Sequence, residues 1–256
     1  MDLVKSPEQI KEIRKLALVI SDILAESIEK LRPEMTSREL DHEVERLMER
    51  HGVNGPCKGY NHFPAVSCIS VNSFVTHSIP DDTIIHAGDI VDIDIVIEKG
   101  GYFADVSKKV GVGTISPEAS RLIKITEECL DGAIRIVRPG TTLGDIGFAV
   151  QSHAETNGYS VVRDFGGHFI GTAMHEGPLV LNYGMPNEGL ALKPGMILCI
   201  EPMINQGKRG VTMDKYGWNA KTRDGKLSSR CEHMVLVTTE GHEVLTRHPA
   251  SAGGVN

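Results

Sequence analysis

The chain has 256 residues, of which 40% are hydrophobic and 24% are charged, proportions typical of a globular protein that buries a substantial core. Its formal net charge of −7 argues against a nucleic-acid-binding surface, and no apolar run approaches the ~18 residues that span a membrane. The charged, amphipathic N-terminus lacks the apolar core of a signal peptide. The five cysteines are widely spaced and form no C-x-x-C pair, which favours reduced thiols and a cytoplasmic location.

Two helices are predicted in the first fifty residues. Ser6 and Gln9 form a capping box, and apolar residues then recur at helical spacing until Pro33 ends the pattern. Thr36 and Glu39 form a second capping box at the start of the next helix. The apolar stripes of both helices are interpreted as core-facing rather than as partner-binding surfaces.

The remaining sequence predicts strands, then helices, then strands again. Short β-rich runs occupy residues 65–112, helical periodicity returns over 117–137 and 143–157, and the rest is again β-like with glycine-rich joints. This order indicates two α+β halves of similar size that share one core. Because no linker composition separates the halves, a single domain is expected over residues 1–256.

A hairpin between residues 90 and 106 carries two acidic residues on predicted strands. In the run IVDIDIVIE, Asp94 lies in mid-strand, where a carboxylate is disfavoured unless it has a partner. If the turn consists of Lys99 and Gly100, Asp94 lies directly opposite Asp105, with Cβ atoms about 5 Å apart. A divalent cation would relieve the repulsion, and this pair alone is also compatible with Ca²⁺ or Mg²⁺. A turn at Gly100 and Gly101 would instead shift the register and separate the two residues.

Three further residues are candidate ligands. His168 lies among glycines in FGGHFIG, Glu201 follows a buried strand in CIEPM, and Glu232 begins the apolar strand CEHMVLVT. Taken singly, each has an ordinary structural explanation. Four carboxylates with one imidazole suit a pair of divalent transition-metal ions better than a tetrahedral structural zinc.

With these motifs the sequence resembles the type I methionine aminopeptidases over nearly its whole length. The resemblance implies a pseudo-twofold α+β "pita-bread" fold, in which helices flank an antiparallel sheet. It also implies two divalent metal ions, for which Fe, Mn, Co and Zn are all suitable, and removal of the initiator methionine from nascent polypeptides, with a preference for a small second residue. The family's metal ligands correspond to Asp94, Asp105, His168, Glu201 and Glu232.

The resemblance also assigns roles near the metals. His77 corresponds to a residue that contacts the substrate beside the scissile bond, and His175 to one that stabilises the developing oxyanion. Glu201 is expected to receive a proton from the attacking water and pass it to the leaving amine. The methionine pocket corresponds to six residues: Cys57, Tyr60, Phe63, Cys68, Met174 and Trp218.

The sequence departs from the family pattern beside this pocket. Asn61 stands where the family often has His, and Met174 where it often has Phe, so the breadth of specificity is open. We expect a monomer that acts on the N-termini of nascent chains, with the ribosome as one place to meet them. Two alternatives are an X-Pro aminopeptidase or dipeptidase, which shares the fold and ligand types, and a non-catalytic binding protein on the same fold.

Overall fold

The computed structural model describes residues 3–246; residues 1–2 and 247–256 of the predicted domain lie outside the described part. The N-terminal half contains the helices α1 (Pro7–Lys30) and α2 (Ser37–His51). The second half contains the helices α3 (Pro117–Arg135) and α4 (Leu143–Thr156). Both predicted capping boxes, at Ser6 and at Thr36, are present. No helix within residues 3–246 is long and apolar enough to cross a membrane.

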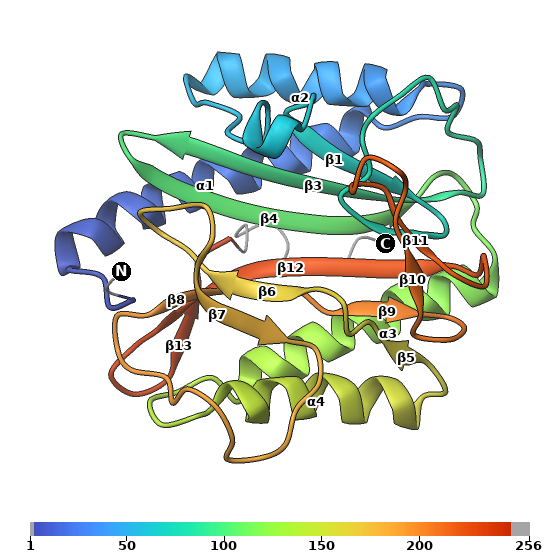
Figure 1. The fold of residues 1–256 in the computed structure, drawn as a ribbon. Helices are drawn as coiled ribbons and strands as arrows, with labels where there is room; N and C mark the ends of the chain where they lie inside the picture. Colours follow the sequence, from blue (N-terminus) through green and yellow to red (C-terminus); the bar gives the residue numbers. More distant parts are fainter. Residues whose placement is uncertain (1–2, 247–256) are drawn as a thin grey trace.

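The strands form one large antiparallel sheet and one small one (Figure 1). The large sheet has the main order β1-β3-β4-β12-β8-β6-β7, with β5, β9 and β13 paired at its sides. Its main strands are β1 (Ser67–Val71), β3 (Ile90–Lys99), β4 (Tyr102–Gly111), β6 (Gly166–Phe169), β7 (Glu176–Leu181), β8 (Ile197–Ile200) and β12 (Ser228–Val237). Its side strands are β5 (Ser160–Val161), β9 (Met203–Asn205) and β13 (His242–Val244). The small sheet, β10-β11-β2, comprises Val211–Thr212, Ala220–Thr222 and Phe74–Thr76.

The β3–β4 hairpin corrects one prediction. The turn consists of Gly100 and Gly101, so Lys99 pairs with Tyr102 and Asp94 pairs with Ser107 rather than with Asp105. Both glycines have positive φ, 62° and 83°, which glycine adopts at little cost and lysine does not. Asp105 pairs with Val96, so the two aspartates remain on one face as diagonal neighbours.

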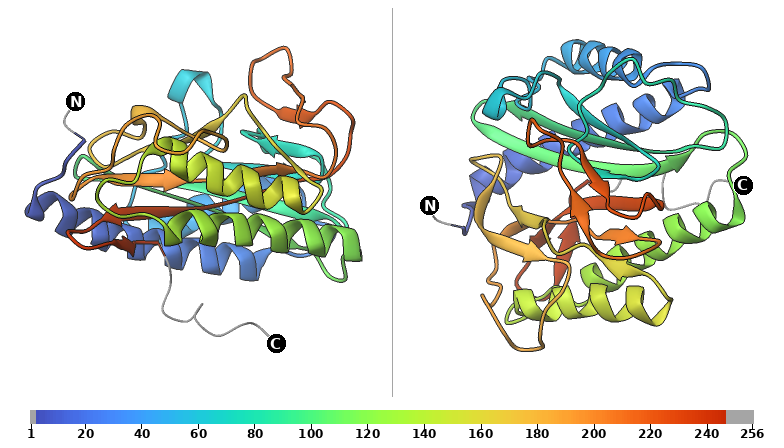
Figure 2. Two further views of the ribbon diagram at one scale, coloured as in Figure 1. Left: turned by 90° about the horizontal axis from the view of Figure 1, so that it is seen from below. Right: turned by 45° about the vertical axis from the view of Figure 1, so that its right-hand side comes forward.

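Two hydrophobic cores support the sheet, one under each pair of helices. The first packs α1 and α2 against β3 and β4, and the second packs α3 and α4 against β8 and β12. Figure 2 shows the strands as a layer between these helices and a group of long loops. The helices therefore pack on one face of the sheet, and the loops that surround the candidate site cover the other face.

Candidate metal centre and substrate cavity

The five predicted ligands come together from four strands of the large sheet and from the residue that directly follows a fifth. Four of these strands, β4, β12, β8 and β6, are consecutive neighbours in the sheet, and β3 adjoins β4. All five side chains are buried, with relative exposures of 0–6%. They are Asp94 on β3, Asp105 on β4, His168 on β6, Glu201 directly after β8, and Glu232 on β12.

The glycine before His168 allows β6 to approach β8. A Cβ atom at Gly167 would lie 2.1 Å from the backbone oxygen of Cys199, so no other residue fits without displacing a strand. The Nδ1 atom of His168 is 3.0 Å from the carbonyl oxygen of Phe169, a distance that assigns the proton to Nδ1. The Nε2 lone pair of His168 then faces the carboxylates.

Glu201 owes its position to a break between two strands. β12 pairs with β8 through residues 233–236 and with β9 through residues 228–230. Glu201 and Pro202 occupy the gap between β8 and β9, where proline needs no ladder hydrogen bond. The Glu201 carboxylate is therefore held beside Glu232 without belonging to a paired strand.

The electrostatics of the cluster call for a cation. The Nε2 atom of His168 lies 3.5 Å from Asp105 Oδ2 and 3.9 Å from Glu201 Oε1. Burial raises the pKa of Asp105 and Glu232 and raises that of Glu201 to about 7, although Arg230 partly opposes the shift in each case. Burial alone would lower the pKa of His168, but its contact with Asp105 raises it.

These residues fit a divalent metal ion. One ligand atom from each of Asp105, His168, Cys199 and Glu232 lies within 4.8 Å of the others. Among residues 3–246, no group donates a hydrogen bond to Asp105 Oδ1 or Glu232 Oε1. Such buried acceptors are costly without a partner, and a metal ion would satisfy them. The Cys199 thiol is a poorer ligand than these oxygens because burial, followed by the charge of Glu232, raises its pKa well above the ordinary value.

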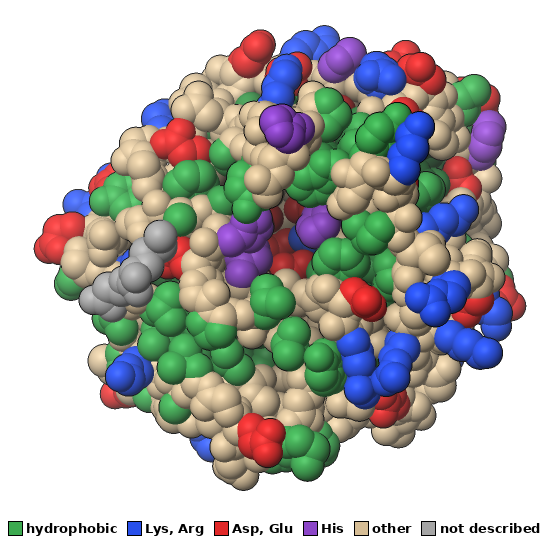
Figure 3. All heavy atoms as spheres, in the orientation of Figure 1, with side chains coloured by type: hydrophobic (Ala, Val, Ile, Leu, Met, Phe, Trp, Pro, Cys, Tyr) green, Lys and Arg blue, Asp and Glu red, His purple; other side chains and the backbone are tan. Residues whose placement is uncertain are grey.

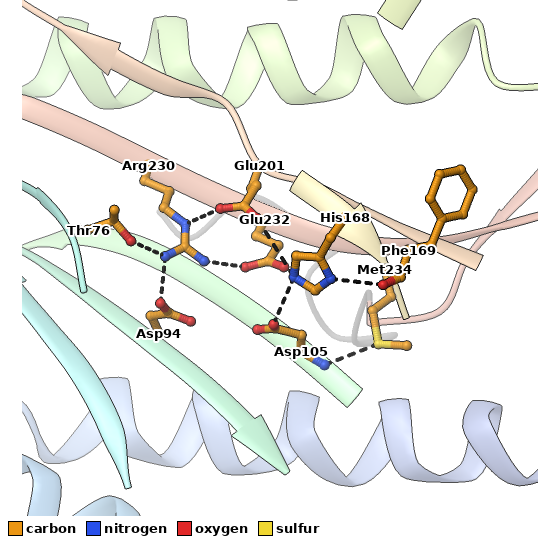
Figure 4. Close-up of polar contacts among 9 residues, drawn as sticks. All are labelled: Thr76, Asp94, Asp105, His168, Phe169, Glu201, Arg230, Glu232 and Met234. Atoms are coloured by element: carbon orange, nitrogen blue, oxygen red, sulfur yellow. Dashed lines mark hydrogen bonds and ion pairs between the residues drawn. The ribbon is translucent and has the colours of Figure 1, made fainter. Parts of the chain in front are cut away.

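Arg230, which the sequence analysis missed, lies within this cluster (Figure 4). Its Nη1 atom is 2.5 Å from Asp94, its Nη2 atom 2.5 Å from Glu232, and its Nε atom 3.1 Å from Glu201. Nη1 also donates to Thr76 Oγ1 at 2.8 Å. The signal was present in the sequence, because residues two apart on a strand share a face, which places Arg230 beside Glu232.

A cavity of about 380 Å³ opens above the cluster. Figure 3 shows it as a hollow with histidines at its sides, acidic groups in its depth and hydrophobic side chains around it. Four predicted ligands line it, while Glu232 lies fully buried beneath. Both predicted substrate histidines and all six predicted pocket residues also line it, namely His77, His175, Cys57, Tyr60, Phe63, Cys68, Met174 and Trp218.

The two histidines stand above the cluster on different sides. The His175 ring lies 4.5 Å from that of His168 and 5.6 Å from that of Tyr60. His77 packs edge-on against Phe165, and its φ of 57° is a left-handed conformation unusual for histidine. Burial away from water and, to a smaller extent, the charge of Arg230 lower the pKa of His77 to about 4, so its ring is neutral at neutral pH.

Aromatic and apolar side chains form one wall of the cavity, beside the carboxylates, since Cys68 pairs with Asp94 across β1 and β3. The rings of Phe63 and Trp218 meet edge to face at 4.9 Å, with Cys68 and Cys57 in the same apolar cluster. The Asp214 carboxylate accepts the backbone N–H of Trp218 at 3.0 Å and so orders the loop that carries the indole. This wall offers an apolar recess next to the polar cluster.

Comparison with known proteins places this site in a family context. The model of metallopeptidase family M24 matches residues 11–239. Methionine aminopeptidase A of Synechocystis sp. is 43% identical over 240 residues, which cover 93% of this chain and 94% of that relative. The crystal structure of methionine aminopeptidase from Rickettsia prowazekii has a TM-score of 0.94 at 37% identity and covers 95% of this chain and 99% of its own.

A more distant structure shares the fold alone. Prolidase from Pyrococcus furiosus has a TM-score of 0.78 at 23% identity; the match covers 96% of this chain and 66% of the prolidase. The expected pita-bread fold, an antiparallel sheet with flanking helices, is confirmed by these matches together with the strand order.

Proposed function

Because the chain belongs to metallopeptidase family M24, we propose that it is a metal-dependent aminopeptidase that removes the N-terminal methionine from polypeptides. The observation that carries the proposal is the cavity, at whose base four carboxylates and an imidazole from distant parts of the chain converge. The apolar recess beside them suits an unbranched side chain. Methionine aminopeptidases that match nearly the whole chain support the same activity.

We assign two divalent ions to this site, in agreement with the ligand set of the family that the sequence resembles. Asp105 and Glu232 would be shared ligands, Asp94 would serve one ion, and His168 and Glu201 the other. Divalent ions bound there would polarise the peptide carbonyl and lower the pKa of a water molecule, so that it loses a proton and attacks as hydroxide. The oxygen-rich donor set tolerates Fe, Mn, Co or Zn, so availability decides which metal is used.

The protein's own groups complete the reaction. Glu201 would receive the water proton and deliver it to the leaving amine. His175, at the mouth above His168, would donate a hydrogen bond to the developing oxyanion, and His77 would orient the peptide on the opposite side.

The apolar recess is assigned to the methionine side chain. Phe63, Cys68 and Trp218 would contact its thioether, and Tyr60 and Met174 would bound the cavity near its opening. The carboxylates beside it would leave room for a free α-amino group and exclude a longer N-terminal extension. A nascent chain in the cytoplasm is the proposed substrate, in keeping with five unpaired cysteines.

Hydrolysis of matched peptides tests this proposal. With Mn²⁺ or Co²⁺ present, the protein should release Met from Met-Ala-Ser and leave Ala-Pro intact. Selective cleavage of Ala-Pro would instead support an X-Pro aminopeptidase or dipeptidase. Metal binding without cleavage of either peptide would support a non-catalytic binding protein on the same fold.

A further inference from the structure

Among the described residues, Arg230 is the one lysine or arginine in direct contact with the carboxylate cluster. Its side chain is 3% exposed, and its guanidinium spans three acidic groups, Asp94, Glu201 and Glu232. It donates hydrogen bonds to one oxygen of Asp94 and one of Glu232, and it forms an ion pair with one oxygen of Glu201 (Figure 4). The other oxygen of Glu201 lies 3.9 Å from His168 Nε2, and the other oxygen of Glu232 has no hydrogen-bond partner within residues 3–246.

This arrangement reduces the mutual repulsion of carboxylates that are buried close together. Asp94, Asp105, Glu201 and Glu232 are all at most 6% exposed, and unpaired carboxylates repel one another strongly in a medium of low dielectric constant. A protein without its metal must either protonate these groups, move them apart, or supply another positive charge. Arg230 cannot lose its proton at physiological pH and presents several donors in a fixed plane.

We propose that Arg230 is a positioning residue that acts as a fixed internal cation for the metal-free enzyme. It holds Asp94, Glu201 and Glu232 in place before metal binds, with their free oxygens directed toward His168 and Asp105. The fold and the ligand geometry therefore do not depend on bound metal. This inference rests on the proposed ligand set, and its test is independent of peptide cleavage.

A second buried cation provides a matched control. Lys109 is 2% exposed, donates to the Ser70 carbonyl oxygen at 3.0 Å, and lies opposite Asp92 in the β3–β4 register. It contacts none of the proposed ligands. Removing the Lys109 charge should thus destabilise the fold equally whether or not metal is bound, whereas removing the Arg230 charge should matter chiefly in the metal-free state.

Thermal unfolding of Arg230→Met, Lys109→Met and the unaltered protein, each in EDTA and in saturating Mn²⁺, separates the possibilities. In EDTA, Arg230→Met should lower Tm by about 6–20 °C, the scale of losing one partner of a buried ion pair in a chain of this size. Mn²⁺ should remove most of that deficit, because the ions then supply the missing charge. Lys109→Met should show the same deficit in both conditions.

Arg230→Lys shows whether charge is the cause. It keeps the positive charge without the planar fork and should recover at least half of the Tm lost in EDTA by Arg230→Met. If Arg230→Met folds only with Mn²⁺, the inference is supported. If it folds in neither condition, Arg230→Gln, which keeps an amide donor without the charge, takes its place under the same criteria.

Two results lead to different conclusions. An equal deficit with and without Mn²⁺ for the uncharged Arg230 variant, or no recovery by Arg230→Lys, would overturn the role of Arg230. Failure of Mn²⁺ to raise the Tm of the unaltered protein would instead overturn the proposed metal ligands.

Discussion

At the scale of single residues, the two histidines above the carboxylate cluster are placed for different contacts. His175 packs against His168 at the mouth of the cavity, whereas His77 packs between Phe165 and Trp218 with a left-handed backbone. Neither ring is hydrogen-bonded to a carboxylate of the cluster among the described contacts. Their arrangement favours contact with the substrate rather than with a metal ion.

Alanine at either histidine should therefore reduce turnover without removing metal. We expect His77→Ala and His175→Ala each to lower kcat by roughly 10²–10³, the scale of losing one contact to a developing oxyanion. Metal content, measured by elemental analysis after dialysis, should equal that of the unaltered protein. A stoichiometric loss of metal in either variant would show that the histidine is a ligand.

The pocket residues Met174 and Asn61 concern specificity. Met174 is 8% exposed, and its flexible side chain can repack around an imperfect ligand. Asn61, which has a φ of 45°, presents a short amide at the same cavity. Both should make the pocket more tolerant than one bounded by a phenyl and an imidazole ring, while leaving the reaction itself unchanged.

We predict that Met remains the best first residue and that norleucine and Leu are accepted to a measurable degree. The double variant Met174→Phe/Asn61→His should discriminate better, by tens of fold at most, because a close-packed methylene contact contributes about 1–3 kcal/mol. The measurement is kcat/KM for Met-Ala-Ser, Nle-Ala-Ser and Leu-Ala-Ser. Unchanged discrimination in the double variant would refute either the pocket assignment or the flexibility argument.

At the scale of elements, close strand approach rather than side-chain chemistry positions His168. Gly167 permits β6 to lie against the Cys199 carbonyl oxygen of β8, where an added Cβ would meet backbone at 2.1 Å. His168 follows directly on this strand, so any displacement of β6 moves the imidazole away from Asp105 and Glu232. The glycine is thus a requirement of the site, although it carries no functional group.

Gly167→Ala should consequently lower both stability and metal affinity. We expect a loss of about 1–3 kcal/mol in the free energy of unfolding, the usual effect of overpacking, and a weaker Kd for Mn²⁺. Gly132→Ala is the control, because its Cβ would meet nothing within 4 Å on α3 and alanine favours a helix. Urea unfolding and calorimetric titration measure both quantities; an unchanged Kd in Gly167→Ala would contradict the argument.

Local sequence signals predicted the elements better than their pairing. The capping boxes at Ser6 and Thr36 act over three residues, so the sequence alone reveals them. The β3–β4 register depends on which two residues form the turn. Because Gly101 has a positive φ, the turn consists of Gly100 and Gly101 rather than of Lys99 and Gly100. Arg230 was not predicted because a search for metal-ligand residue types does not include arginine. Its spacing of two residues from Glu232 nevertheless indicates that both side chains lie on the same face of the strand.

At the scale of the whole molecule, the site exists only when both halves of the chain are folded together. Asp94 and Asp105 come from the first half, and His168, Glu201 and Glu232 from the second. The two halves meet where β4 pairs with β12, with Glu232 opposite Ser107. The core around α1 and α2 also contains Cys199 of β8 and Met234 of β12, so the two halves share packing as well as the β4–β12 pairing that brings the two sets of proposed ligands together.

The spatial convergence of these residues could not be derived from composition or periodicity. It followed from the family resemblance, and the sheet order now gives its physical basis: β3, β4, β12, β8 and β6 are consecutive neighbours. The departures at Asn61 and Met174 concern the cavity wall and leave this arrangement intact.

The most direct test of the account is the metal dependence of methionine release by the unaltered protein and by Asp105→Asn. Release of Met from Met-Ala-Ser should stop after EDTA treatment and dialysis, return on addition of Mn²⁺ or Co²⁺, and require a free α-amino group. Asp105→Asn, whose circular dichroism should match that of the unaltered protein, should stay inactive at saturating metal because it lacks a proposed shared ligand. Full activity in EDTA, or full activity of Asp105→Asn with metal, would contradict the account.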